Sequence, residues 1–162
     1  MIEIEHKDAI INTFILFIQT AQAVLKSADA YLYRKANLSV IKLIALQALD
    51  KNNGVMTPSE LAEWTQTERH NITALVQRMK RDDLVKSERS SKDKRIVHIS
   101  LTDKGREVLE RSMPAAREIK DLIMSSITED EAALIASKLR VLRKNAFDTL
   151  GQMSFHIKKW PE

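Results

Sequence analysis

Hydrophobic residues along most of the chain recur every three to four positions, which is the spacing of an amphipathic α-helix. One region instead alternates apolar and polar residues, as a half-buried β-strand does. The pattern predicts helices over residues 6–35, 39–51, 57–64, 67–81, 102–126 and from 128 to 153 or beyond. It predicts strands over residues 55–56, 84–89 and 95–101. The chain is therefore expected to be mainly α with a small β-hairpin (α+β).

The helix predicted at residues 67–81 has one apolar and one polar face. The apolar face carries Ile72, Leu75, Val76 and Met79. The opposite face carries His70, Thr73, Ala74, Gln77 and Arg81. After Glu68 the polar face holds no acidic residue, and its imidazole, hydroxyl and amide groups can hydrogen bond to base edges. Amphipathicity alone would favour an ordinary solvated helix, so the segment that follows decides the interpretation.

That segment is predicted to form a β-hairpin with a basic tip. Its second strand alternates, with Val97, Ile99 and Leu101 on one face. The tip carries Lys92, Lys94 and Arg95 around the single Asp93. Two helices followed by such a hairpin form a winged helix-turn-helix, which places a helix in the major groove of DNA and the hairpin tip in the neighbouring minor groove. The alternative is a basic hairpin that only faces solvent.

The first predicted helix has an apolar stripe that is too wide for one neighbouring element. A free monomer would expose part of this stripe, so we expect part of it to form a dimer interface, with burial in its own subunit as the alternative. Residues 10–18 are strongly apolar but too short to cross a bilayer. Acidic residues among the first five argue against a signal peptide. These features predict a cytoplasmic protein without a membrane contact.

Capping residues support the predicted helix boundaries. Thr57 and Glu60 have the spacing of a capping box, with Pro58 at the first helical position. The other expected N-caps are Ser39, Thr102 and Thr128. Within the helix that follows Thr57, we expect Leu61, Ala62 and Trp64 to pack inward.

The positive charge is concentrated in the predicted helix-turn-helix and hairpin. The chain of 162 residues has a net charge of +4, and residues 69–106 hold eleven Lys or Arg against five Asp or Glu. This concentration indicates a polyanionic partner, with a solvated basic surface as the alternative. The chain has no cysteine, which excludes disulfides, thiolate metal sites and cysteine-based redox sensing.

The sequence contains no pattern that is typical of an enzyme or a metal site. His6, His70, His98 and His156 do not have the paired spacing of metal ligands. There is also no nucleophile–base constellation, nucleotide-binding glycine loop or pair of catalytic carboxylates. We therefore predict a non-enzyme that needs no cofactor.

Several segments resemble the MarR family of bacterial and archaeal transcriptional regulators. The most specific are Asp93-Lys94-Arg95 at the hairpin tip and Leu101-Thr102-Asp103-Lys104-Gly105 after it. Residues 56–62, 75–79 and 84–85 match as well, and helical flanks of suitable length lie on both sides. The resemblance covers nearly the whole chain.

This resemblance implies an N-terminal dimerisation helix at residues 1–36, a winged helix-turn-helix lobe at 37–102 and C-terminal dimerisation helices at 103–162. It implies a homodimer that regulates transcription, most commonly as a repressor, by binding double-stranded DNA at a pseudo-palindromic operator. Two recognition helices would enter successive major grooves about 10 bp apart.

The residues expected at the DNA form two groups. In the recognition helix they are Thr67, Arg69, His70, Asn71, Thr73, Ala74, Gln77, Arg78 and Arg81. In the wing they are Arg89, Lys92, Asp93, Lys94 and Arg95. The histidine, amide and hydroxyl side chains would meet base edges, and the helix arginines would meet phosphates or hold the wing. Arg95 would enter the minor groove, with Asp93 holding its guanidinium.

Three positions depart from the family pattern. Many members carry glycine where Gln66 and Asp83 stand, so a non-glycine residue must take each tight turn, with a φ above zero. Many members carry arginine where Ala74 stands. Without that arginine an expected guanine contact is absent, and the Ala74 methyl group can instead touch a thymine methyl.

The resemblance also implies an effector, because many members release DNA when a small, often aromatic molecule binds between the dimer helices and the winged lobe. Such a pocket would draw on the first helix, the second helix and the helix after the wing, with Trp64 or Tyr31 and Tyr33 at its border. A nonspecific architectural DNA-binding protein and a winged-helix protein-interaction module are the alternative functions. The mixed polar face disfavours the former, and the basic wing disfavours the latter.

Overall fold

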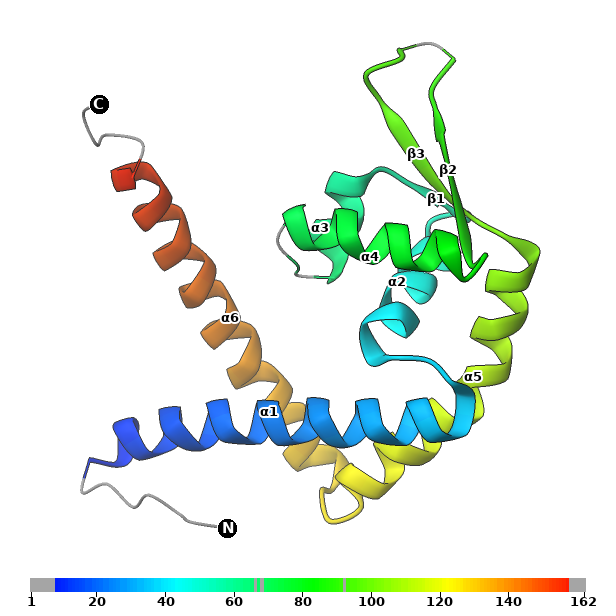
Figure 1. Cartoon of the computed structure of the whole chain (residues 1–162). Coiled ribbons are helices and arrows are strands. Elements are labelled where there is room, and N and C mark those ends of the chain that lie inside the picture. The colour runs from blue at the N-terminus through cyan, green and yellow to red at the C-terminus, as the bar shows by residue number, and fades with distance from the viewer. Residues whose placement is uncertain (1–7, 66, 68, 92, 158–162) are drawn as a thin grey trace. The chain divides into compact units, whose positions relative to one another are not determined.

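The computed structural model describes residues 8–65, 67, 69–91 and 93–157, without the side chains of Arg69 and of residues 152–157. The chain forms two compact units, residues 1–123 and 124–162. Within the described residues, the first unit contains a three-stranded antiparallel sheet with helices, and the second contains one long helix (Figure 1). The predicted fold class, mainly α with a small β-sheet, is confirmed.

The first helix, α1 (Ala9–Ala36), begins where Asp8 caps it. The Asp8 carboxylate accepts hydrogen bonds from the backbone N–H groups of Ile10 at 2.8 Å and Ile11 at 3.2 Å. The helix ends at Asn37, whose φ of 52° places it in the left-handed conformation that ends many helices. The expected start at residue 6 lies outside the described residues.

Most of the apolar stripe of α1 is exposed within the first unit. Leu32 is its one fully buried residue, whereas Ile10 is 80% and Phe14 is 61% exposed. By length and composition alone α1 could cross a membrane, since an 18-residue window has a mean hydropathy of 1.4. We expected the apolar segment to be too short to cross a bilayer because only residues 10–18 were counted. The apolar part of α1 is longer than that. A helix face that another protein chain covers has the same character.

The helix α2 (Val40–Lys51) lies at the centre of the first unit. Ser39 is its N-cap, as predicted, and the carboxylate of Asp29 in α1 accepts a hydrogen bond from the Val40 N–H at 2.7 Å. Its buried residues are Leu43, Ala45, Leu46, Ala48 and Leu49. The bond from Asp29 satisfies one of the free N–H groups at the start of α2 and joins α1 to the core.

A short strand and two helices follow. The strand β1 (Val55–Met56) leads into α3 (Pro58–Thr65), and α4 (Arg69–Arg81) follows α3 after a short turn. Leu61 is buried as predicted, but Trp64 is 46% exposed, so its expected inward packing was wrong. At the turn, Gln66 lies outside the described residues.

The sheet has the order β1-β3-β2 and is antiparallel throughout. The strands β2 (Val85–Arg89) and β3 (Val97–Leu101) form the wing hairpin, in which Val85 pairs with Leu101 and Arg89 with Val97. The strand β1 pairs with the other edge of β3 near the base of the hairpin. The predicted short strand at residues 55–56 is confirmed.

The core of the winged lobe joins all of these elements. Its side chains with at most 1% exposure include Leu46, Leu49, Leu61, Ile72, Leu75, Met79 and Ile99. Each such side chain stabilises the fold by roughly 1.5–3 kcal/mol relative to exposure. Since α4 and the wing bury residues in this one core, their positions are coupled.

The helix α5 (Asp103–Met124) begins directly against the loop between α4 and β2. Thr102 caps α5, because its hydroxyl accepts the Gly105 N–H at 2.9 Å and donates to the Asp83 carbonyl at 2.8 Å. The Thr102 N–H also donates to the Leu84 carbonyl at 3.2 Å. A Cβ atom on Gly105 would lie 2.1 Å from the Leu84 carbonyl oxygen. The Leu-Thr-x-x-Gly motif therefore places a cap and a glycine where α5 touches the backbone of the wing.

Tyr31 of α1 forms a polar contact with α5. Its side chain hydrogen bonds to Glu118, and this bond, with burial and the charge of Glu118, raises the pKa of Tyr31. Lys35 of α1 lies 3.9 Å from the same carboxylate. Tyr31 thus belongs to the junction of α1 and α5.

The second unit is built on α6 (Glu129–Ile157). Thr128 caps it as predicted, and the Glu131 carboxylate accepts hydrogen bonds from the Thr128 N–H at 2.9 Å and hydroxyl at 2.8 Å. The exposed large apolar residues of α6 include Leu134, Ile135, Leu139, Val141, Leu142, Phe147 and Leu150. Exposed apolar residues in this number are typical of a helix that another protein chain covers.

The capping box of α3 makes a prediction about acid titration. The Glu60 carboxylate accepts hydrogen bonds from the Thr57 N–H at 2.7 Å and hydroxyl at 2.9 Å, and these hold its pKa below the ordinary 4.5. A carboxylate with a lowered pKa stabilises the fold above that ordinary value, and this contribution is lost as pH falls through the lowered pKa. We expect carboxyl NMR titration to find the Glu60 pKa below 4.5.

Thr57→Ala should raise the Glu60 pKa part of the way, because the Thr57 hydroxyl is lost while the backbone N–H remains. Glu131 is the internal control, because its own cap holds its pKa low in the same way and does not involve Thr57. An unchanged Glu60 pKa in this variant would contradict the capping geometry.

Candidate nucleic-acid interface

The helix α4 presents a polar face to solvent and an apolar face to the core. Ile72, Leu75 and Met79 are at most 1% exposed, and Val76 is 9% exposed. The outward side chains with exposed surface are His70, Asn71, Thr73, Ala74, Gln77, Arg78, Lys80 and Arg81. The face predicted from helical spacing is therefore the solvent-exposed one, although the side chain of Arg69 lies outside the described residues.

The N-terminal end of α4 is held by the end of α3. The Thr67 N–H donates to the Ala62 carbonyl at 3.0 Å, and the Thr67 hydroxyl donates to the Thr65 carbonyl at 3.2 Å. Both bonds are local, and Thr67 is half-buried. Thr67 therefore lies at the entrance of α4, as predicted, and its hydrogen bonds also position the start of that helix.

The C-terminal end of α4 is held by a left-handed turn and an ion pair. Asp83 has a φ of 60°, as predicted for a residue standing where glycine is common, and the Leu84 N–H donates to the Met79 carbonyl at 2.9 Å. The Lys42 ammonium of α2 lies 2.6 Å from the Asp82 carboxylate. This ion pair joins residues far apart in the chain, and no pattern in the sequence indicated it.

The wing tip is ordered by backbone hydrogen bonds around Asp93. Its carboxylate accepts the Arg95 N–H at 2.9 Å, and its carbonyl accepts the Ile96 N–H at 2.9 Å. The Ser90 N–H donates to the Ile96 carbonyl at 2.9 Å across the hairpin. Asp93 therefore shapes the turn through the backbone of Arg95, and not through the guanidinium contact that we expected.

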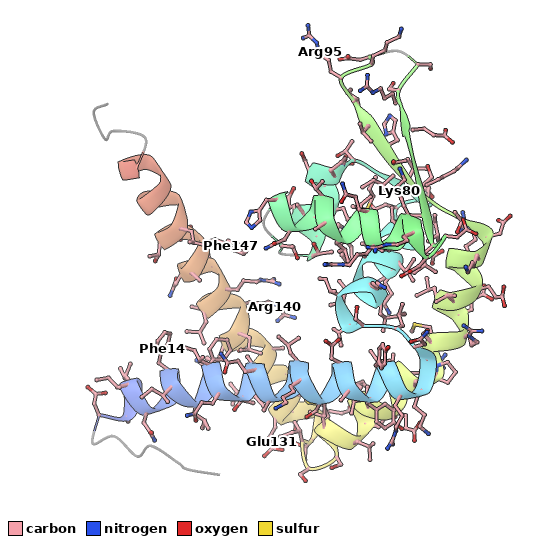
Figure 2. All side chains as sticks on the ribbon, in the orientation of Figure 1. Phe14, Lys80, Arg95, Glu131, Arg140 and Phe147 are labelled. Atoms are coloured by element: carbon pink, nitrogen blue, oxygen red, sulfur yellow. The ribbon has the colours of Figure 1, made fainter. Side chains whose placement is uncertain are left out.

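Apart from Lys86, which lies 3.2 Å from the Glu88 carboxylate within β2, the described cations of α4 and the wing have no acidic partner. Figure 2 shows Arg95 at the tip of the hairpin and Lys80 on α4. Among the described side chains, no carboxylate lies within the 4.0 Å of an ion pair from Arg78, Arg81, Arg89, Lys94 or Arg95. Lys92, predicted in the same group, lies outside the described residues. Unpaired cations at the surface of one lobe form a positively charged site for phosphates.

A cavity of about 380 Å³ lies between α1, α2 and the end of α3. It is lined by Leu25, Lys26, Asp29, Val40, Ile41, Ile44 and Thr65. Its size is in the range of small-molecule sites, and its walls are largely aliphatic. Its lining residues come from α1, α2 and α3, and do not include Tyr31 or Tyr33.

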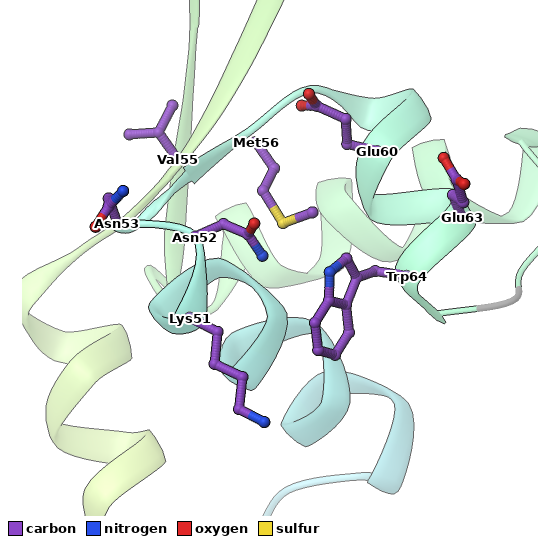
Figure 3. A pocket seen from close by; sticks show the side chains of 8 residues that line it. All are labelled: Lys51, Asn52, Asn53, Val55, Met56, Glu60, Glu63 and Trp64. Carbon is purple, nitrogen blue, oxygen red and sulfur yellow. The ribbon is translucent and has the colours of Figure 1, made fainter.

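Trp64 instead borders a second cavity of about 430 Å³ (Figure 3). The ring has the Lys51 ammonium 5.7 Å from its centre, a cation–π distance. The other lining residues are Asn52, Asn53, Val55, Met56, Glu60 and Glu63. This cavity lies beside the base of the sheet and outside the polar face of α4.

Comparisons with known proteins place this lobe in a family. Residues 36–96 match the model described as the MarR family. The chain is 32% identical to the HTH-type transcriptional repressor NicR of Pseudomonas putida, over 64% of this chain and 65% of NicR. It is 30% identical to the HTH-type transcriptional repressor MdtR of Bacillus subtilis, over 65% of this chain and 69% of MdtR. The chain belongs to the MarR family.

MarR-family membership confirms the resemblance and the prediction of a non-enzyme, because these relatives are transcriptional regulators. The chain spans about two thirds of the length of these curated relatives, 65% and 69%. The fold also matches a solved structure, that of Sco3205, a MarR-family regulator of Streptomyces coelicolor in complex with DNA. The TM-score is 0.78 at 22% identity, over 83% of this chain and 88% of that chain.

Proposed function

We propose that this MarR-family protein is a homodimeric, sequence-specific regulator, and most simply a repressor, that binds double-stranded DNA at a pseudo-palindromic operator. The observation that carries the proposal is the exposed polar face of α4 beside unpaired wing cations, on a lobe whose core joins both. A rigid link between a base-reading helix and a cationic hairpin matches two neighbouring grooves of one duplex.

The helix α4 supplies base contacts in the major groove. His70, Asn71, Thr73 and Gln77 offer donors and acceptors there, and Ala74 offers a methyl group. Arg69, Arg78 and Arg81 contact phosphates, since arginine side chains reach the backbone on either side of a groove.

The wing supplies contacts in and beside the minor groove. Arg95 enters the groove from the hairpin tip, and Asp93 fixes the turn that presents it. Lys92 and Lys94 contact the flanking backbone, and Arg89 contacts it from β2. These contacts hold the duplex without distinguishing its sequence directly.

The apolar helices form the dimer. In α1 the residues Ile10, Phe14, Phe17 and Leu25 are all at least 40% exposed, and α6 has an exposed apolar stripe of its own. A second copy of the chain would cover both, and a two-fold axis would place two α4 helices about 10 bp apart. In this layout, residues 1–36 and 103–162 are dimerisation helices and residues 37–102 are the DNA-binding lobe.

The cavity between α1, α2 and α3 is the proposed site of a small-molecule effector. Asp29 and Val40 both line this cavity, and the hydrogen bond between them connects the dimerisation helix to the winged lobe. A ligand there would change the spacing of the two α4 helices only if it bound one spacing more tightly than the other.

The test is a comparison of two duplexes, the DNA upstream of the protein's own gene and a scrambled sequence of equal length, across a salt series. The wild type should bind the upstream duplex more tightly. Arg95→Ala should weaken binding to both duplexes, because the wing holds the backbone of any sequence. It should also reduce the slope of log affinity against log salt by about 0.9 for each lost phosphate contact.

Lys120→Ala is the matched control, because it removes one positive charge from α5, where Lys120 is already paired with Asp121 at 2.8 Å. Equal wild-type affinity for many unrelated duplexes would instead support the architectural alternative. A folded dimer that binds no duplex at low salt would support the protein-interaction alternative.

A further inference from the structure

The outward centre of α4 is a single line of four side chains. His70, Ala74, Gln77 and Arg81 all lie within about 40° of the direction opposite Ile72, at about 100° per residue. All four are exposed. This line is the part of α4 that would reach deepest into a major groove, because Ile72 fixes the opposite side in the core.

The middle of this line can recognise adenine and thymine but has no arginine or lysine, the residues that most often read guanine. The Gln77 amide has one donor and one acceptor side, which match the N6 and N7 positions of adenine. The Ala74 side chain has only a methyl group, which fits the thymine methyl and cannot bond to guanine O6. His70 can donate to N7 of either purine and so does not distinguish them.

Ala74 and Gln77 are three residues apart, so their side chains are neighbours on the helix surface. They would therefore contact adjacent base pairs. Arg81 is the one arginine of the line, but it lies at the C-terminal end of α4. Recognition helices contact bases mainly through their N-terminal residues, which leaves Arg81 nearer the phosphates.

The wing gives the same preference independently. The exposed Arg95 at its tip is presented by the Asp93 turn. Minor grooves narrow at A·T-rich sequences, and the stronger negative potential there attracts arginine. An A·T-rich flank would therefore bind this wing better than a G·C-rich one.

We propose that each operator half-site has two adjacent A·T base pairs at its centre, the adenine of one read by Gln77 and the thymine of the other by Ala74, and an A·T-rich flank under the wing. This inference rests on the proposed function. It adds the base composition of the site, which that function leaves open.

Selection from a pool of random duplexes by the full-length protein tests the inference. The wild-type motif should hold adenine beside thymine at two central positions of each half-site. Gln77→Ala should relax the adenine position, with a loss of about 5- to 150-fold against the best site. Ala74→Arg should change the neighbouring position from an A·T to a G·C pair. Lys94→Ala, a wing control, should weaken binding without changing the motif.

A second measurement isolates one methyl group. Replacing the selected thymine by uracil removes only its 5-methyl, and should weaken wild-type binding by about fourfold, the value of one buried methylene-sized group. Ala74→Gly should show no such loss, because the partner methyl is absent. Circular dichroism checks that each variant keeps its helices, which we expect because the substituted side chains are exposed.

The outcomes separate the two proposals. A defined palindromic motif with G·C pairs at the positions that respond to Ala74 and Gln77 would overturn this inference and leave the regulator function standing. Failure to enrich any duplex would overturn both. An uracil effect that is equal in wild type and Ala74→Gly would overturn the role of Ala74.

Discussion

Replacing Gly105 with alanine is expected to destabilise the folded protein by about 3 kcal/mol or more. The new Cβ would lie 2.1 Å from the Leu84 carbonyl oxygen and 2.9 Å from the Leu101 side chain. The nearer atom belongs to the backbone, so no change of side-chain rotamer can relieve the clash. The first turn of α5 would have to move away from the loop between α4 and β2.

That movement would also break the hydrogen bonds of Thr102 to Asp83 and Gly105. Because these bonds hold the base of the wing against the end of α4, DNA affinity should fall together with stability. The measurement is urea unfolding followed by circular dichroism.

Gly151→Ala is the matched control for this substitution. A Cβ on Gly151 would meet no atom within 4 Å. Alanine is favoured over glycine inside a helix, so this variant should be as stable as the wild type or more stable by up to about 1 kcal/mol. Equal stability of Gly105→Ala and the wild type would contradict the close packing of α5 on the wing.

The double substitution Phe14→Asp and Phe17→Asp is expected to separate the dimer into folded monomers. These side chains are 61% and 40% exposed within one chain. Covering that area in both copies would contribute about 3–6 kcal/mol to dimerisation, so its loss should weaken the dimer by about 10²- to 10⁴-fold. The two new carboxylates would add a desolvation cost.

Sedimentation equilibrium measures this dissociation, and operator binding should weaken with it, because a monomer reaches only one half-site. Gln19→Asp places one carboxylate on the opposite side of α1 and should leave the dimer intact. Monomers of wild-type protein at micromolar concentration would contradict the interface. Association of the wild type with lipid vesicles would instead favour a membrane role for α1.

The features that could be predicted from the sequence are those that depend on local spacing. The two faces of α4 follow from helical periodicity, because the spacing of about 3.6 residues per turn does not depend on the rest of the fold. The β2–β3 hairpin follows from alternation at residues 97–101. The capping box follows from the spacing of Thr57 and Glu60, and Thr128 was predicted as an N-cap. The positive φ of Asp83 was predicted from the family resemblance, because many members carry glycine at that turn, and its φ of 60° confirms the prediction.

The features that could not be predicted depend on contacts between distant segments. The Lys42–Asp82 ion pair and the Asp29–Val40 hydrogen bond each join two different elements of the fold. The residues around each partner therefore give no local pattern that would predict them. Trp64 has the apolar character of a core residue, but packing leaves it 46% exposed beside Lys51. The Asp-x-Arg pattern indicated a contact correctly, but the backbone N–H of Arg95 makes it.

Hydroxyl-radical footprinting on the tightest duplex selected from a random pool tests the central proposal most directly. Two chains that each place α4 in a major groove and Arg95 in the adjoining minor groove should protect the two half-sites symmetrically. The centres of protection should lie about 10 bp apart. Arg95→Ala should remove protection selectively at the outer minor grooves. A single unsymmetrical footprint, or uniform protection of the whole duplex, would contradict a sequence-specific dimer.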